Sequence, residues 1–160
     1  MSFEPSKELK QVFHLASLRS FARQNLKGDE WQAVSTLMDR MKRERAAEEK
    51  DYRANYDTRV ETARRALIDK AGAKSNEFKP PQFGVDRFDE NAIERQAHRM
   101  VHAEHSARMA GLDQLETSEL ERLTQPAHKR MAEQQDVRVQ FQRSSDRRVL
   151  PSRRRQRTMS

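Results

Sequence analysis

The 160-residue sequence predicts an all-α, elongated protein in which two long helices form an antiparallel, coiled-coil-like hairpin. Charged residues make up 36% of the chain and hydrophobic residues 34%, whereas globular domains have about 25% charged and 45–50% apolar residues. Apolar residues recur at steps of three and four over long stretches, which is the period of one helix face. The few glycines and prolines mostly fall between these stretches, where helices begin and end.

Residues 1–28 predict a short amphipathic helix that begins after an N-cap at Ser6. From Leu9 to Gly28 this segment contains four basic residues and no acidic one, a pattern also typical of a membrane-surface helix or an organelle presequence. Glu4 and Glu8 argue against a presequence. We favour a helix that folds back onto the apolar start of the next helix.

Residues 29–72 predict a long charged helix, because Asp29 and Gln32 form a capping box and Gly72 is the next helix-ending residue. Its two ends are apolar and its middle is charged, with ten acidic and ten basic residues in all. Charge-balanced faces of this kind are typical of solvated helices and of coiled-coil flanks. The first apolar end supplies four candidate protein-contact residues: Trp31, Val34, Met38 and Met41.

Residues 73–88 predict a connector, since Pro80 and Pro81 impose an extended conformation. The connector carries three candidate contact residues spaced five apart: Phe78, Phe83 and Phe88. We favour a plug in which these rings close the open end of the hairpin. The alternative is an extended motif that docks into the groove of a partner protein.

Residues 89–124 predict the second long helix, with Asp89 as its N-cap, and a short connector makes the two long helices antiparallel. Pro126 is well suited to a first helical turn, so the sequence predicts a stop and a restart at this point. A weak third helix is expected over residues 125–142, because its apolar residues are few.

Three histidines, His98, His102 and His105, share one face of the second long helix with Glu94. Imidazoles four residues apart can chelate Zn²⁺ or Ni²⁺. His98 and His105, however, lie about 10 Å apart along the axis at 1.5 Å per residue, too far to surround a tetrahedral ion without a second helix. The metal site is therefore a minor hypothesis, and we favour surface histidines that make the helix sensitive to pH.

Other chemistry is sparse. The sequence has no cysteine, no glycine-rich phosphate loop and no arrangement of a nucleophile with a base. Its paired carboxylates lie in charged helical sequence, without the apolar surroundings that tune a catalytic acid. No apolar run is long enough to span a membrane. We expect a cytoplasmic protein without catalytic activity or a cofactor.

Residues 143–160 predict a disordered basic tail with seven arginines and one aspartate, a net charge of +6, while the other 142 residues carry 25 basic and 24 acidic side chains, a net charge of +1. Arginine-rich segments bind polyanions through phosphate contacts and counterion release, without reading sequence. The candidate nucleic-acid-binding residues are Arg143, Arg147, Arg148, Arg153, Arg154, Arg155 and Arg157.

The sequence thus predicts a helical binding or scaffold protein that contacts nucleic acid non-specifically through its tail. Its thin apolar seams also predict self-association or a helical protein partner. The alternative is a structural or adaptor protein of a larger assembly, such as a viral particle or a secretion or conjugation machinery, whose tail contacts an acidic protein surface or a transport receptor. The arginine-spaced terminus resembles the C-terminal signals of type IV secretion substrates, which implies a secreted substrate.

Overall fold

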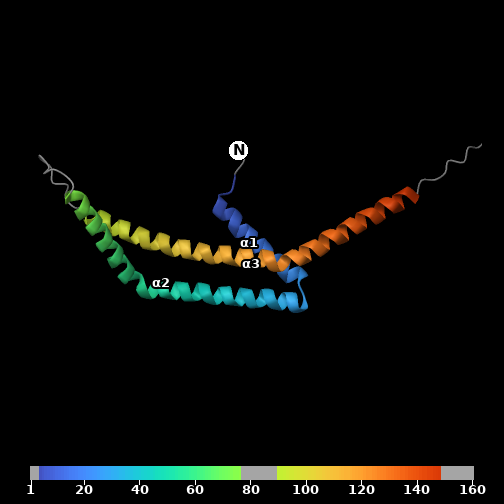
Figure 1. The fold of residues 1–160 in the computed structure, drawn as a ribbon, viewed down its shortest axis with the longest axis horizontal. Coiled ribbons are helices and arrows are strands. Elements are labelled where there is room, and N and C mark those ends of the chain that lie inside the picture. The colour runs from blue at the N-terminus through green and yellow to red at the C-terminus, as the bar shows by residue number, and fades with distance from the viewer. Residues whose placement is uncertain (1–3, 77–89, 149–160) are drawn as a thin grey trace, which may run out of the picture.

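The computed structural model describes residues 4–76 and 90–148, which form three α-helices. These are α1 (Lys7–Asn25), α2 (Gly28–Asn76) and α3 (Glu90–Arg148). α2 and α3 lie side by side in opposite directions, α1 crosses α3, and the last part of α3 extends alone beyond this body (Figure 1). The prediction of an all-α protein is confirmed.

The turn between α1 and α2 follows from local chemistry. The Ser6 side chain caps α1 by accepting a hydrogen bond from the Leu9 backbone N–H at 3.3 Å. α1 ends at Asn25, and its C-cap Leu26 is extended but still donates its N–H to the Ala22 carbonyl at 3.0 Å. Gly28 then has φ +59°, a left-handed conformation that glycine adopts without strain. The chain can therefore reverse within two residues.

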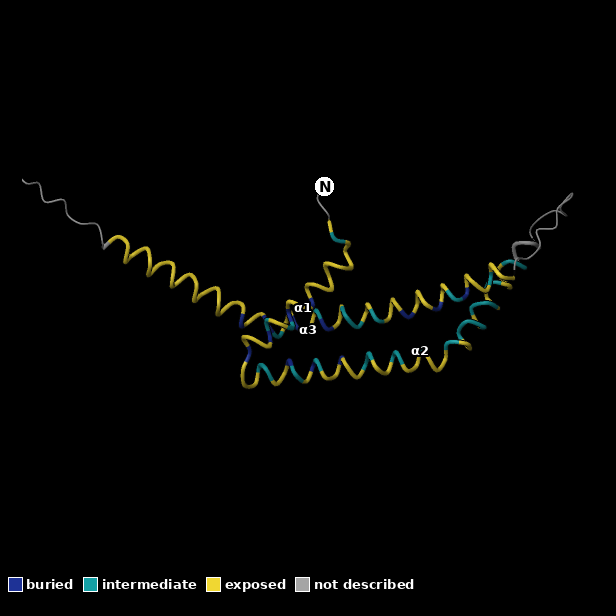
Figure 2. The backbone as a smooth tube through the Cα atoms, turned by 180° about the vertical axis from the view of Figure 1, so that it is seen from behind, coloured by how far each residue is buried: buried dark blue, intermediate teal, exposed yellow. Residues whose placement is uncertain are grey.

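The core lies where the three helices meet (Figure 2). Its buried residues come from all three helices: Leu15, Leu18, Ala22, Leu26, Val34, Leu37, Met41, Leu120 and Ala127. α1 does fold back, as expected, but it packs more on α3 than on α2. Of the four contact residues predicted on α2, Val34 and Met41 are fully buried, and Trp31 and Met38 pack partly buried against the core. The apolar start of α2, which the favoured interpretation of the sequence covers with α1, is thus packed within the chain.

Near the end of α2 and the start of α3, few apolar residues are buried between these two helices. Ala97 and Val101 of α3 are buried, and Tyr52 and Tyr56 of α2 are half-buried. α2 bends in its second half toward the start of α3, so the two helices meet again at this end (Figure 1). Because of this bend, the few apolar residues of α2 and α3 remain in contact toward this end of the hairpin.

The predicted stop before Pro126 does not occur, because α3 is one helix of 59 residues with Pro126 inside it. Proline removes one backbone hydrogen bond and costs a helix interior about 3 kcal/mol. Leu120 and Ala127, on either side of this site, are both buried in the core, which holds the helix together. α3 changes direction near the crossing with α1, as expected for a proline within a helix (Figure 1).

Two predicted boundaries also differ from the structure. α2 continues past Gly72 to Asn76, and residues 143–148, predicted as part of the disordered tail, are helical in α3. The phenylalanine plug and the end of the tail remain predictions, because they lie outside the described residues. These positions are Phe78, Phe83, Phe88, Arg153, Arg154, Arg155 and Arg157.

Candidate nucleic-acid interface

The last part of α3, residues 128–148, is called the arm here. Every side chain from position 128 to 147 is exposed, and the arm is uniformly exposed along its length in Figure 2. Two contacts hold its base: Arg130 donates two hydrogen bonds of 2.8 Å to the Glu30 carboxylate of α2, and His128 stacks on Phe21 of α1 with ring centroids 3.7 Å apart. The arm is therefore anchored at one end and reaches into solvent.

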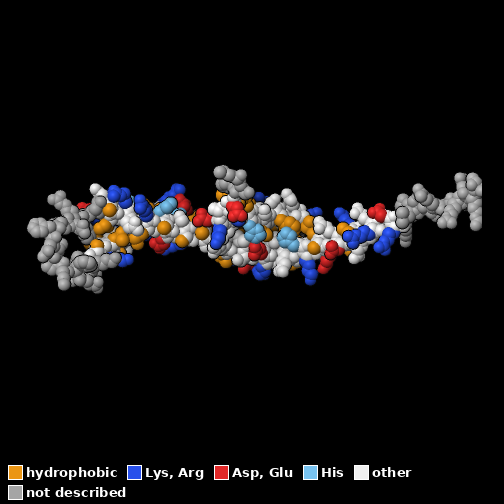
Figure 3. Space-filling view, turned by 90° about the horizontal axis from the view of Figure 1, so that it is seen from above, with side chains coloured by type: hydrophobic (Ala, Val, Ile, Leu, Met, Phe, Trp, Pro, Cys, Tyr) orange, Lys and Arg blue, Asp and Glu red, His pale blue; other side chains and the backbone are white. Residues whose placement is uncertain are grey.

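The candidate arginines fall at the end of this arm. Arg143 and Arg147 are exposed and lie four residues apart, hence on one helix face, and Arg148 is the last residue of α3. Arg138, which no sequence pattern singled out, is also exposed on the arm. Seen from above, basic side chains predominate toward the end of the arm (Figure 3). Among the described residues, Arg138, Arg143 and Arg147 make no ion pair.

In the body, by contrast, a buried carboxylate engages arginines of the other two helices. Glu116 of α3 is 1% exposed. Its Oε1 accepts a hydrogen bond from Arg19 Nε and its Oε2 one from Arg19 Nη2, both at 2.7 Å. Arg45 of α2 also donates to Oε2, and it donates to Asp113 Oδ1 at 2.6 and 3.1 Å. The network ties α1, α2 and α3 together at one point.

The charge state of this network follows from its contacts. Burial alone would raise the pKa of Glu116, but the hydrogen bonds from Arg19 and Arg45, reinforced by their charges, outweigh it and hold the pKa below its ordinary value. Burial opposes the charge of Arg45 in the same way, yet its bonds to Glu116 and Asp113 raise the pKa of the guanidinium. Both shifts favour the charged forms, so the network holds the three helices together as ion pairs.

The three candidate histidines His98, His102 and His105 have different surroundings in α3. His98 Nδ1 lies 2.5 Å from the Tyr56 hydroxyl. The His105 ring stacks on Tyr52 with centroids 3.8 Å apart, and its Nε2 lies 3.1 Å from Glu49 Oε2. His102 is exposed. The preference for surface histidines is therefore wrong for His105, which is buried between the helices.

This arrangement does not favour the metal hypothesis. The part of the chain that the structure describes contains no group of three histidine, cysteine, aspartate or glutamate side chains placed to hold a metal ion. His98 and His105 instead contact α2 because the helices are antiparallel, so the two tyrosines of α2 meet them in reverse order.

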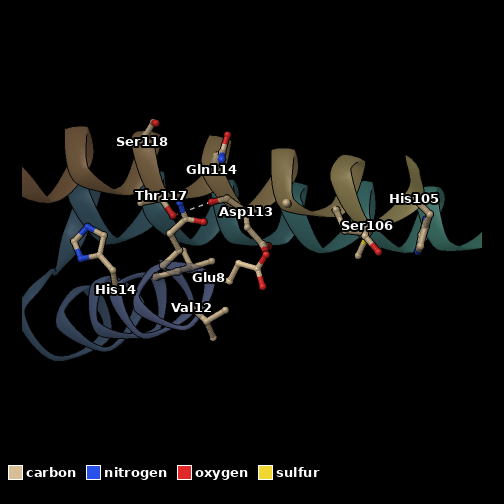
Figure 4. Close-up of a pocket in the computed structure, with 13 residues that line it drawn as sticks. Glu8, Val12, His14, His105, Ser106, Asp113, Gln114, Thr117 and Ser118 are labelled. Atoms are coloured by element: carbon tan, nitrogen blue, oxygen red, sulfur yellow. Dashed lines mark hydrogen bonds between the residues drawn. The ribbon is translucent and has the colours of Figure 1, made fainter. Parts of the chain in front are cut away.

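A groove of about 720 Å³ lies between α1 and α3. Figure 4 shows Glu8, Val12 and His14 of α1 on one side of it and Asp113, Thr117 and Ser118 of α3 on the other. Its lining contains two carboxylates, Glu8 and Asp113, and no lysine or arginine. No sequence pattern predicts this groove, because it depends on the angle at which α1 crosses α3.

Comparisons of the chain with protein-family models, with curated proteins and with solved structures found no match. Among the described residues, no helix has an apolar stretch sufficient to cross a membrane.

Proposed function

We propose that this chain is a non-enzymatic helical binding protein that contacts nucleic acid non-specifically through the basic end of α3. One observation carries the proposal: α3 leads its arginines out of the body on an exposed helix. Whereas Arg19 and Arg45 are engaged by buried or half-buried carboxylates in the body, Arg143 and Arg147 make no ion pair within the described residues. Their guanidinium groups are available to an external anion.

Phosphate is the anion that this chemistry fits best. The guanidinium group offers a planar fork of donors that matches phosphate oxygens, and neutralising phosphates releases condensed counterions. No aromatic residue follows Phe141 in the sequence, so base stacking by the basic end is not expected. Contacts to phosphate without contacts to bases give binding without sequence preference.

The body supports a scaffold role. Its two most buried ionisable side chains among the described residues, Glu116 and His105, are both engaged in contacts between helices. A catalytic acid or base needs access to a substrate proton, whereas both oxygens of Glu116 accept hydrogen bonds from arginines and His105 Nε2 faces Glu49. The helical body then serves to hold the arm and to contact other proteins.

The test is binding of labelled double- and single-stranded DNA and RNA across a salt series, comparing the full chain with one truncated after Gln142. We expect binding that weakens steeply with salt and is lost on truncation. In the full chain, replacing Arg143 and Arg147 with glutamine should reduce the salt slope on duplex DNA by about 1.8, at about 0.9 per phosphate contact.

A matched control is Lys7→Gln with Lys10→Gln, which removes the same charge from exposed positions of α1. This control should keep the slope of the unmodified chain. An equal loss in both double variants would mean that total charge, and not the arm, governs binding. Failure of the full chain to bind at low salt would overturn the proposal.

The alternative is an adaptor in a larger assembly, such as a viral particle or secretion machinery, with the basic end as a docking or transport signal. Val137 and Phe141 favour it, because both are exposed on the arm and phosphate contacts use neither. Binding to an immobilised acidic protein in the absence of any nucleic-acid binding, lost on truncation after Gln142, would support this alternative.

A further inference from the structure

The apolar stripe that packs α3 into the core is interrupted at the base of the arm and resumes near its end. Leu120, Leu123 and Ala127 follow the alternating steps of three and four residues of a coiled-coil seam, and the same spacing passes through the polar residues Arg130 and Gln134 before it reaches Val137 and Phe141. Leu120 and Ala127 are buried by the other helices, whereas Val137 is 64% and Phe141 73% exposed. The same face is thus an internal interface within the body and an uncovered one on the arm.

A second uncovered apolar face lies on α1. Leu9, Val12 and Phe13 follow the i, i+3, i+4 spacing of one helix face, and Phe13 is 63% exposed. Val12 also lines the groove between α1 and α3. The first half of α1 and the arm rise from the same side of the hairpin (Figures 1 and 2). The arm cannot cover its own α1, because α3 leads it away from the crossing.

The groove and the arm carry opposite charges, whereas the exposed Lys7 and Lys10 of α1 lie outside the groove lining. The groove beside α1 is lined by Glu8 and Asp113 without lysine or arginine, although Asp113 is shared with Arg45. The arm has five basic and three acidic side chains over residues 128–147, a difference of +2. Arg138, directly after Val137, is exposed and unpaired within the described residues. An arm that entered the groove would bring Arg138 toward Glu8.

We propose that the chain forms a twofold dimer in which the arm of each copy packs on the α1 face and into the groove of the other copy. Such an interface uses the same two patches on both copies, as twofold symmetry requires. This inference does not depend on nucleic-acid binding, because the basic end of α3 lies beyond the apolar stripe.

The area favours this pairing over one between the two arms. A stable interface buries roughly 1,200 Å² or more in total. At about 150–250 Å² for each aromatic ring, the exposed parts of two Phe13 and two Phe141 rings supply only roughly 500 Å². The leucine, valines and groove walls of the α1 contact are needed for the rest. Pairing of arms alone would bury Val137 and Phe141 and leave the α1 face uncovered.

Cross-linking can test the geometry directly, because the chain contains no cysteine. One sample of the full chain carries Val12→Cys and a second, of different mass, carries Val137→Cys. Mixing and oxidising them should give the mixed disulfide. The control is Val139→Cys, which is exposed but lies about 200° around the arm from Val137, and it should not cross-link to Val12→Cys. Preferential Val137→Cys homodimers would show arm-to-arm pairing and overturn the proposal.

Sedimentation across a micromolar concentration series tests the dimer itself. Phe13→Glu and Phe141→Glu change exposed side chains, so circular dichroism should show both variants folded, and each should weaken dimerisation at least about a hundredfold. Val139→Glu should leave the dimer intact. An unmodified chain that stays monomeric throughout the series, or variants that dimerise like it, would overturn the inference.

Discussion

Arg19 of α1 and Glu116 of α3 form a bidentate ion pair in which both N–O distances are 2.7 Å. Arg45 of α2 adds a further hydrogen bond to the same carboxylate. Buried ion pairs balance a large desolvation cost against specific geometry, so removing one partner costs more than the pair itself contributes. Here the geometry fixes the point at which α1 crosses α3, and hence the shape of the groove beside it.

Glu116→Gln should destabilise the fold, because it leaves two arginines near a buried position without their anion. Arg19 and Arg45 are 32% and 20% exposed, so water relieves part of this cost. We expect the free energy of unfolding to fall by roughly 2–3 kcal/mol, just below the range for breaking a fully buried pair. Urea denaturation followed by circular dichroism measures it. Glu119→Gln, which breaks a more exposed pair with Arg122, should change little.

The contribution of Glu116 should also depend on pH. Its pKa in the folded state lies below the ordinary value of 4.5, so the unfolded chain takes up the proton first as the pH falls. The stabilisation is therefore present above about pH 4.5 and is lost as the pH falls through the folded pKa. The difference in unfolding free energy between the unmodified chain and Glu116→Gln should be constant near neutral pH and shrink in acid. A difference that persisted unchanged to about pH 3 would contradict this assignment.

The Tyr56 hydroxyl and the His98 ring should be energetically coupled. They lie 2.5 Å apart across α2 and α3, and a hydrogen bond of this kind contributes about 0.5–1.5 kcal/mol. A double-mutant cycle of Tyr56→Phe with His98→Ala should give a coupling free energy in this range. The matched cycle of Tyr56→Phe with His102→Ala, an exposed residue, should give none. Equal coupling in both cycles would argue against the contact.

Two glycines should respond in opposite directions to alanine. Gly111 lies inside α3 and an added Cβ would meet no atom within 4 Å, so Gly111→Ala should stabilise the fold by about 0.5–1 kcal/mol. Gly28 also has space, but its φ of +59° is strained for a residue with a side chain, and Gly28→Ala should destabilise by about 1–2 kcal/mol. Thermal unfolding compares them, and the same sign of shift for both variants would contradict the roles given to these two positions.

Local rules explain why the helices and the first turn could be predicted. Ser6 and Gly28 act through neighbours in the sequence, so the cap of α1 and the turn before α2 follow from the order of residues alone. The continuity of α3 through Pro126 does not follow from the order of residues, because Leu120 and Ala127 pack against residues that are far away in the sequence. A local signal for a helix stop is overruled by tertiary packing.

The charged contact at the crossing also has a signal in the sequence. Glu116 lies four residues after Leu112 and four before Leu120, on the same helix face. An acidic residue within an apolar stripe requires a buried cation, and that requirement can be deduced from spacing alone. The identity of the arginines cannot be deduced from spacing, because the angles between the helices bring Arg19 and Arg45 to Glu116.

The exposure of the arm has a consequence for how such a sequence can change over time. Residues 131–147 bury nothing in the core, so most substitutions there alter recognition without a cost in folding. The constraint that remains is helicity. A segment of this length is only marginally helical by itself, and the packed part of α3 supplies the helical turns from which the arm continues. Selection on binding can therefore act on the arm residue by residue, while selection on stability acts on the body.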